Sequence, residues 1–251
     1  MDFEMTNQYI KSVDLKRERI ASFEEYPFCL PAIRNIDNLE FHPKVTFFVG
    51  ENGTGKSTIL ESIAAAYGFN PEGGSKNFSF STANSHSDLY NFVKLVKGVR
   101  RPKDGFFLRA ESFYNVASYI DDLDREASFG PPIKDSFGGK SLHEQSHGES
   151  FFSLFIHRLR GYGVYILDEP EAALSPSRQM SLLSRMHELV NKDSQFIIAT
   201  HSPIIMAYPD AFIYEIKDDI RKVKYEETEH YQITRAFINH RDGMLKELML
   251  P

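Results

Sequence analysis

Residues 45–58 read VTFFVGENGTGKST and contain the most specific motif of the chain. The first five residues, VTFFV, are almost entirely apolar, β-branched or aromatic, which is typical of a strand buried in a parallel sheet. The run stops at Gly50, and residues 57–67 then repeat apolar side chains with the period of a helix. We therefore expect a strand, a glycine-rich loop and a helix in direct succession.

The loop matches the pattern G-x-x-x-x-G-K-[ST], which binds triphosphates when it lies between a strand and a helix. Its glycines let backbone N–H groups point at phosphate oxygens, and the helix that follows adds its positive end. Lys56 is expected to reach the β- and γ-phosphates, Ser57 to coordinate Mg²⁺ and Thr58 to contact the α-phosphate. We expect ATP and Mg²⁺ to be held by Gly50, Glu51, Asn52, Gly53, Thr54, Gly55, Lys56, Ser57 and Thr58.

Further apolar runs extend the strand and helix alternation along the chain. Residues 164–167 end at Asp168, residues 196–199 end at Thr200, and a helix with Pro176 in its first turn separates them. A further strand is expected at residues 211–216. Alternation of this kind predicts an α/β fold with a mostly parallel sheet flanked by helices.

The remaining segments are assigned around this sheet. The alternating pattern before Val45 suits an antiparallel N-terminal flank, and a helical lobe is placed at residues 112–160. A last helix is expected at residues 231–248, broken or weakened near Gly243. We expect residues 1–251 to form a single domain, since α/β domains often exceed about 200 residues.

Two carboxylates and a histidine follow the predicted strands. Asp168 and Glu169 come at the end of one strand, where ligands of open α/β sheets bind. Asp168 is expected to hold Mg²⁺ through water, and Glu169 to accept a proton from the attacking water. His201, at the end of the next strand, is placed to contact the γ-phosphate or that water. Chance acids at a solvated strand end and a structural histidine are the competing interpretations.

In combination, these motifs resemble the ABC-type ATPases, a family of P-loop NTPases. Residues 145–149, QSHGE, lie where that family has an L-S-G-G-Q-like signature, which closes over the γ-phosphate bound to a second subunit. The resemblance implies that ATP binding drives a head-to-tail homodimer, with signature contacts made in trans by Ser146, His147, Gly148, Glu149 and Ser150. His147 departs from the pattern by replacing its first glycine. Taken alone, the segment favours an ordinary N-cap of a helix at residues 150–159.

The resemblance also implies roles for residues elsewhere. Glu169 would be the catalytic base, His201 the switch histidine, Lys56 a catalytic cation, and residues 172–175 the D-loop, with Ser175 in place of its usual aspartate. The Q-loop glutamine has no clear counterpart. Glu111, after the strand-like residues 106–110, is the best positional candidate for that place as a Mg²⁺ ligand.

Within the family, the phrases GKSTILESI and THSP resemble the stand-alone SMC, RecF and OLD-like branch of AAA/ABC ATPases. No heptads are present, so the coiled-coil arm of SMC proteins is missing. This branch suggests roles in DNA-related or defence processes. The ATP-binding subunit of a membrane transporter and a non-hydrolysing, nucleotide-dependent interaction module stay open as alternatives.

Composition narrows the setting of the protein. The 251 residues carry a net charge of −6, which argues against a broadly basic surface. Cys29 is the single cysteine, so no internal disulfide forms, which favours the cytoplasm. No secretory signal and no apolar run of about 18 residues is present, so no direct membrane insertion is expected.

Two assignments stay open between a binding role and a structural one. Tyr26 or Phe28 is a candidate for stacking on adenine, without a motif to place it. A basic segment suits either nucleic-acid phosphates or a solvated turn at Gly98 and Pro102. Its cationic residues are Lys94, Lys97, Arg100, Arg101 and Lys103. A protein partner is the other candidate for what the ATP cycle acts upon.

Overall fold

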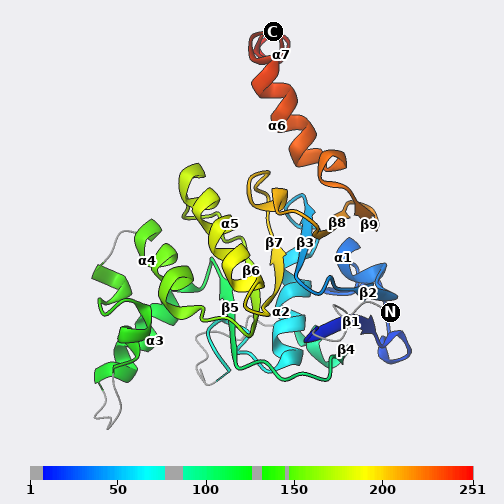
Figure 1. Cartoon of the computed structure of the whole chain (residues 1–251). Coiled ribbons are helices and arrows are strands. Elements are labelled where there is room, and N and C mark those ends of the chain that lie inside the picture. The colour runs from blue at the N-terminus through cyan, green and yellow to red at the C-terminus, as the bar shows by residue number, and fades with distance from the viewer. Residues whose placement is uncertain (1–7, 77–86, 126–131, 145–146, 251) are drawn as a thin grey trace.

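A six-stranded sheet forms the centre of the protein. The structure, a computed structural model, describes residues 8–76, 87–125, 132–144 and 147–250 (Figure 1). Five neighbouring strands run parallel, and β9 closes one edge antiparallel to β8. In spatial order the strands are β5 (Asp104–Arg109), β6 (Gly163–Asp168), β7 (Gln195–Ala199), β3 (Val45–Gly50), β8 (Phe212–Ile216) and β9 (Ile220–Val223). The predicted α/β class with a mostly parallel sheet is confirmed.

Both faces of this sheet are buried, as the apolar strands require. All six residues of β3 are buried, and successive side chains point to opposite faces. Phe47 belongs to the core on one face and Phe48 to the core on the other. Helix α5 (Pro176–Val190) packs over the Phe47 face, and helix α2 (Lys56–Tyr67) packs over the Phe48 face.

A second, three-stranded antiparallel sheet confirms the predicted N-terminal flank. Its order is β2 (Asn38–Glu40), β1 (Ile10–Leu15) and β4 (Val93–Lys97). Strand β4 includes Lys94 and Lys97, so the turn expected around Gly98 and Pro102 is shorter than the basic segment. The chain enters β5 at Asp104 directly after that turn.

Helices between residues 112 and 160 gather beside β5, in the green part of Figure 1, where the helical lobe was predicted. The helix expected at residues 150–159 instead begins at His147 as α4 (His147–Ser153) and widens into a π-helical turn at Leu154–Arg158. The other elements are α3 (Phe113–Arg125) and the 3₁₀ turns Ile133–Phe137 and Leu142–Glu144. Whether the lobe and the sheet form one domain stays a prediction.

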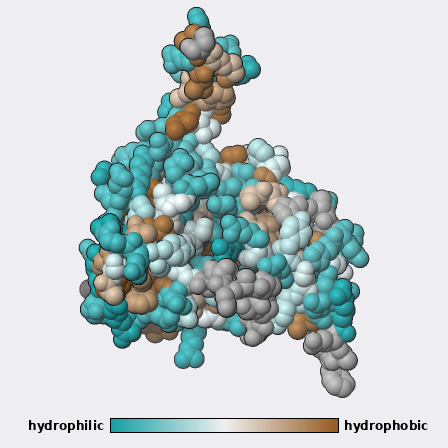
Figure 2. Space-filling model, turned by 180° about the vertical axis from the view of Figure 1, so that it is seen from behind, coloured by the Kyte–Doolittle hydropathy of each residue, from teal (hydrophilic) through white to brown (hydrophobic). Residues whose placement is uncertain are grey.

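The C-terminal helices α6 (Glu229–Asn239) and α7 (Arg241–Leu248) form an arm that projects from the body (Figure 1). Neither helix contains a buried residue, and apolar side chains are visible along the arm in Figure 2. The predicted break of the last helix is found, but it lies at His240, whose φ is −129°, and not at Gly243 itself. Gly243 lies inside α7, because one glycine weakens a helix by only about 1 kcal/mol.

Short helices complete the described chain. They are α1 (Pro31–Arg34) and the 3₁₀ turns Arg17–Arg19, Asp88–Asn91, Ile205–Ala207 and Tyr225–Glu227. None of the helices in the described ranges has the length and apolar composition to cross a membrane.

Candidate nucleotide site

The Gly50 loop connects β3 to α2 in a conformation that depends on glycine. Gly50 has a φ of +145°, and a Cβ atom there would lie 2.3 Å from the carbonyl oxygen of Ile216. Gly55 has a φ of +98° and precedes the first residue of α2, whose N-terminus has no side-chain cap. The first N–H groups of a helix have no intrahelical acceptor. At the N-terminus of α2 these N–H groups have no capping side chain, and the positive end of the helix dipole there favours a bound anion.

Lys56 is folded into the loop. Its side-chain Nζ donates hydrogen bonds of 2.8 Å to the carbonyl oxygens of both Gly50 and Glu51. The residue is only 4% exposed, and burial lowers the pKa of its ammonium group, against the opposing effect of the Glu169 and Asp168 carboxylates. A buried cation bonded only to neutral carbonyls is well prepared to exchange them for a charged acceptor.

Ser57 and Asp168 meet at the base of the loop. The Ser57 hydroxyl donates a hydrogen bond of 3.0 Å to Oδ1 of Asp168, which ends β6. Burial raises the pKa of Asp168 to about 7, the Ser57 hydrogen bond acts in the opposite direction, and the charge of Glu169 raises it further. The loss of hydration at this carboxylate therefore outweighs the stabilisation that its neighbours give to its charge.

These two side chains fit Mg²⁺, which prefers oxygen ligands and retains several waters. No cluster of three or more His, Cys, Asp or Glu side chains suited to a metal is found in the described ranges. A Mg²⁺ ion here would therefore be coordinated by Ser57, Asp168, water and oxygens of the bound nucleotide.

Glu169 follows β6 with a strained backbone. Its φ of +51° is unusual for a residue with a side chain, and its N–H donates a 3.0 Å hydrogen bond to the carbonyl of Ala199. Such conformations cost about 1 kcal/mol or more and concentrate at functional sites. The Glu169 side chain is 38% exposed, and its Oε1 lies 3.5 Å from Nε2 of His201. The carboxylate is thus open to solvent while facing the histidine.

His201 is held between two strand ends and α6. Its backbone N–H donates to Oε1 of Glu171 at 2.6 Å, and its Nδ1 lies 3.1 Å from Nε2 of His230. Burial lowers the pKa of His201, and the charge of Lys56 lowers it further. When His230 Nε2–H donates to His201 Nδ1, the proton of neutral His201 sits on Nε2, the atom that faces Glu169.

His230 was missed by sequence reasoning. It lies 29 residues beyond His201 on the second residue of α6, outside any recognisable motif. Nδ1 of His230 and Nε2 of His201 are buried and have no hydrogen-bond partner among the described residues. One hydrogen bond therefore joins the two rings, and the other nitrogen of each ring is able to bond to a ligand or to water.

Glu111 occupies the same edge of the sheet but a different environment. Its side chain is 79% exposed and forms a 3.2 Å ion pair with Arg109, which also binds Glu61 of α2 at 2.8 Å. The negative charge of Glu111 contributes to the raised pKa of Asp168. The structure thus brings Glu111 near the Ser57–Asp168 pair while Arg109 holds its carboxylate.

The signature segment is described only in part. Ser146 and the side chain of His147 lie outside the described residues. At Gly148, a Cβ atom would lie 2.8 Å from the carbonyl oxygen of Ala173, so this segment packs against the 172–175 turn. Ser150 is 1% exposed, which keeps its hydroxyl inside this chain, whereas Glu149 is exposed.

Ser175 and the adenine candidates have identifiable surroundings. Ser175 is the N-cap of α5 and accepts a hydrogen bond from the N–H of Arg178, so it has a helix-capping role where the family has aspartate. Tyr26 is 66% exposed, whereas the ring of Phe28 packs against Phe92 at 5.0 Å between centroids. Of the two rings, Tyr26 is the one with an open surface.

Family models match two stretches of the chain. Residues 18–130 match a model described as an AAA domain, and residues 150–207 match one described as an AAA domain, putative AbiEii toxin, type IV TA system. The first stretch contains the Gly50 loop, and the second contains Asp168, Glu169 and His201. Both halves of the candidate site are therefore covered.

Two curated relatives are named as ATP-binding proteins of importers or transporters. The chain is 24% identical over 225 residues to the arabinose import ATP-binding protein AraG of Mannheimia succiniciproducens, covering 80% of this chain and 41% of AraG. It is 28% identical over 192 residues to the putative ABC transporter ATP-binding protein TTE0246 of Caldanaerobacter subterraneus, covering 69% of this chain and 77% of that protein. The chain thus spans well under half the length of AraG.

The fold is similar to that of a nucleotide-free ATP-binding cassette from an ABC transporter. The two structures share a TM-score of 0.51 at 15% sequence identity, with 91% of this chain and 96% of the other covered. At this identity the similarity shows the fold alone. Together with the glycine loop and the strand-end carboxylates, the two AAA-domain matches and this fold support a P-loop ATPase of the ABC type.

Proposed function

We propose that the chain binds ATP with Mg²⁺ at the Gly50 loop and hydrolyses it with Glu169 as general base. The observation that carries this proposal is the 3.0 Å hydrogen bond between Ser57 and Asp168, which joins the phosphate loop to the strand end that bears Glu169. Both oxygens are suited to the Mg²⁺ that accompanies ATP. Glu169 follows immediately, solvent-accessible and next to His201.

Each residue has a defined task in this proposal. The uncapped N–H groups at the start of α2 donate to the phosphates, and Lys56 exchanges its two loop carbonyls for β- and γ-phosphate oxygens. Glu169 takes a proton from water as that water attacks the γ-phosphorus, which breaks the bond to the β–γ bridging oxygen. Mg²⁺, when bound, neutralises charge on the phosphates.

His201 is assigned to the γ-phosphate. Neutral His201 with its proton on Nε2 donates a hydrogen bond toward a γ-phosphate oxygen, beside the water that Glu169 aligns. Its lowered pKa supports the neutral form at pH 7. Because the tautomer depends on the hydrogen bond from His230, that residue is a positioning residue for His201.

ATP-dependent pairing of two copies completes the cycle in this proposal. The signature segment, with half-buried Gly148 and exposed Glu149, meets the γ-phosphate bound by the other copy, and loss of that phosphate releases the pair. The family's head-to-tail arrangement supports this, as does the packing of Gly148 against the 172–175 turn. Ser150 contributes through its backbone, since its side chain is buried. We place this cycle in the cytoplasm and in the stand-alone branch of the family.

A second candidate function is that of a transporter's ATP-binding subunit. The names of both curated relatives favour it. It requires a partner that spans the membrane, because no helix among the described residues does so. Isolation of the tagged protein from detergent-solubilised cells decides: stoichiometric recovery of a membrane protein establishes the transporter function, and its absence from the purified active ATPase rules it out.

The test of hydrolysis is phosphate release by Glu169→Gln beside a matched control, Glu188→Gln, on the exposed side of α5. Removing the base is expected to slow phosphate release at least about 100-fold while ATP still binds, whereas the control keeps its rate. Size-exclusion chromatography with ATP should show the Glu169→Gln variant as a dimer and the ADP form as a monomer. Phosphate release by Glu169→Gln at the wild-type rate would refute the assigned base. If the wild-type protein binds ATP without hydrolysing it, the chain is instead a nucleotide-dependent interaction module.

A further inference from the structure

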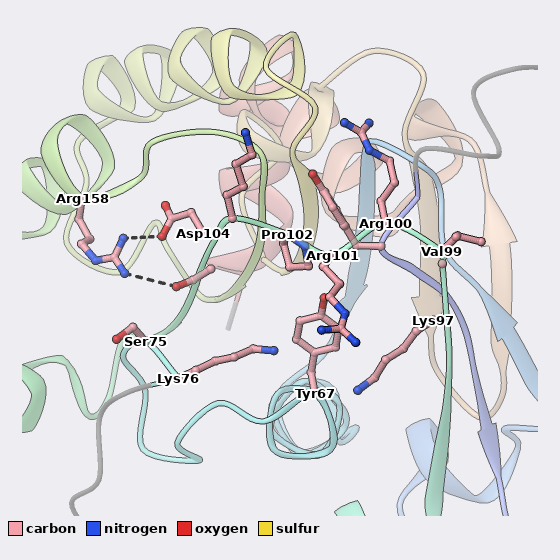
Figure 3. Close-up of a pocket in the computed structure, with 14 residues that line it drawn as sticks. Tyr67, Ser75, Lys76, Lys97, Val99, Arg100, Arg101, Pro102, Asp104 and Arg158 are labelled. Carbon is pink, nitrogen blue, oxygen red and sulfur yellow. Dashed lines mark hydrogen bonds and ion pairs between the residues drawn. The ribbon is translucent and has the colours of Figure 1, made fainter.

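A basic pocket lies at the other end of α2 from the Gly50 loop. Its volume is about 740 Å³, and it is bounded by Tyr67 at the end of α2, the turn between β4 and β5, and Arg158 (Figure 3). Helix α2 has 12 residues and is therefore about 18 Å long. The pocket is thus separate from the candidate nucleotide site.

The pocket contains an excess of positive charge. Two of its basic side chains are paired, Arg100 with Asp193 at 3.1 Å and Arg158 with Asp104 at 2.7 Å. Four further cations line it without a carboxylate in ion-pair distance within the described ranges. They are Lys76, Lys97, Arg101 and Lys103. In Figure 3 the side chains of Lys76, Lys97 and Arg101 point into the pocket.

An aromatic ring supports two of these cations. Nζ of Lys76 lies 4.0 Å from the centre of the Tyr67 ring, and Nζ of Lys97 lies 4.9 Å from the same centre. Burial lowers the pKa of Lys76, and the charge of Lys97 lowers it further. The carbonyl end of α2 favours a cation nearby, but this effect is confined to the last helical turn and does not account for four. The remaining positive charge is uncompensated by the described residues.

The backbone that carries the cations is fixed in place. The N–H of Gly98 donates to the carbonyl of Tyr9 at 2.8 Å, and the N–H of Lys103 donates to the carbonyl of Tyr162 at 2.8 Å. A Cβ atom on Gly98 would overlap the carbonyl oxygen of Gln8, so the close approach of the turn to β1 requires glycine. The backbone of the turn is therefore in place before any ligand binds, which reduces the part of the ordering cost that comes from the backbone.

We propose that this pocket binds a compact anion carrying two or more phosphate groups, with Lys76, Lys97 and Arg101 as its ligating side chains (Figure 3). The volume lies within the range of about 300–1,000 Å³ that is usual for small-molecule sites. A long polyanion fits less well, because the chain as a whole carries a net charge of −6 that repels it outside the pocket. The ligand is either an inorganic polyphosphate or a nucleoside carrying several phosphates.

Calorimetry with two probes tests this assignment and distinguishes the two sources. The Lys56→Ala protein is used so that the Gly50 loop contributes little binding, and inorganic tripolyphosphate and adenosine 3′,5′-bisphosphate are titrated without Mg²⁺. We expect at least one probe to bind with an affinity that falls as salt is added. Tighter binding of tripolyphosphate identifies an inorganic ligand, and tighter binding of the bisphosphate identifies a nucleoside ligand.

The decisive comparison is between two double variants with the same change in net charge. Lys97→Glu with Arg101→Glu should weaken binding of the probe at least about 10-fold, since two attractions become repulsions. Lys94→Glu with Lys246→Glu, both exposed and outside the pocket, should change it less than about 2-fold. If the first double variant does not fold, Lys97→Gln with Arg101→Gln replaces it.

Two results would overturn the proposal. One is equal probe affinity in the pocket and control variants, or no binding of either probe. The other is binding of a 20-nucleotide single-stranded DNA that depends on Lys97 and Arg101 and is not displaced by either probe, which would assign the pocket to nucleic acid. Phosphate release from ATP is measured on the same pocket variants with Lys56 intact and should be unchanged, so a failure here is separate from a failure of the ATPase proposal.

Discussion

In the two proposals, the two ends of α2 hold phosphate in different ways. At the N-terminus, the Gly50 loop offers backbone N–H groups around one buried lysine, and the arrangement depends on glycines at fixed positions. At the C-terminus, the basic pocket uses exposed side chains around Tyr67, drawn from three separate segments. The first site depends on backbone conformation and the second on side-chain charge. A substitution at the Gly50 loop should therefore disturb both binding and folding, whereas a substitution in the basic pocket should disturb binding alone.

This difference explains what a sequence reveals about each site. A site built from backbone requires small residues in a fixed order, and that order is visible as a motif. A site built from side chains requires only that cations from distant segments meet, which leaves no spacing to recognise. The basic residues 94–103 stand out by their charge, but nothing in the sequence associates Lys76 and Tyr67 with them before the fold is known.

The largest effect is expected from Gly50→Ala. The added Cβ would lie 2.3 Å from the carbonyl of Ile216 at a φ of +145°, so the loop and β8 must separate. We expect nucleotide binding to fall at least about 100-fold and the melting temperature to fall by about 5 °C or more. Gly243→Ala, where the space is open, is the control. Normal ATP affinity in Gly50→Ala would show that nucleotide binding does not depend on the backbone conformation at Gly50, and the contrast between the two sites would then be wrong.

His230→Ala tests whether a side chain outside the motif contributes to the nucleotide end. Loss of the 3.1 Å contact leaves His201 free to change tautomer, so kcat is expected to fall about 10-fold with little change in KM. His230→Gln, which can still donate to Nδ1 of His201, should restore part of the rate, while His240→Ala on the exposed arm should have no effect. A pH–rate profile unchanged between wild type and His230→Ala would count against the positioning role.

Asp168→Asn tests the cost of a buried charge at the same end. The folded-state pKa is about 7 and the unfolded value about 3.8, so the folded protein binds the extra proton between these values. Stability of the ligand-free wild type should therefore decline as pH rises through this window, and the asparagine variant should escape that decline. The difference in stability between the asparagine variant and wild type should therefore grow in favour of the variant by at least about 1 kcal/mol from pH 5 to pH 8, measured as a difference in melting temperature.

The exposed Asp242→Asn variant is the control for this measurement, since it should show no such change with pH. Addition of Mg²⁺ and ATP at pH 8 should reverse the order of stability, because only the wild type has the carboxylate. Parallel melting curves for Asp168→Asn and wild type across the pH range would show that the buried charge costs nothing.

The smallest effect on folding is expected at the basic pocket. Lys97→Gln removes one cation–π contact with Tyr67 but also one repulsion with Lys76, and each is worth at most about 1 kcal/mol at an exposed site. We expect the melting temperature to stay within about 2 °C of wild type in differential scanning fluorimetry. A shift as large as that of Gly50→Ala would show that the lysine supports the fold rather than a ligand.

Local sequence was sufficient wherever one segment determines its own structure. The strands at 45–50, 163–168 and 195–199 appear within one residue of their predicted bounds, because each is a continuous apolar run that ends at a polar or glycine residue. Helix α5 begins at Pro176 with Ser175 as its cap, a start signal visible in the sequence. The phosphate loop belongs to the same class.

Features that depend on distant partners were not predictable in this way. Strand β4 reads VKLVK, a weak pattern whose pairing is decided by β1, about 80 residues earlier in the chain. His230 gains its place only because α6 brings it against His201. The helix break lies at His240, three residues before the glycine near which the sequence predicted it, because a single glycine is tolerated inside α7.

The projecting arm gives the contact between His201 and His230 a mechanical meaning. His230 lies in the first turn of α6, where the arm leaves the body, while α7 extends well beyond it (Figure 1). Most of the arm therefore lies outside the body (Figure 1), and the imidazole of His230 is its contact with the candidate nucleotide site. Because His230 lies in the first turn of α6, a displacement of α6 relative to the body would change the distance between His201 and His230 and with it the tautomer of His201.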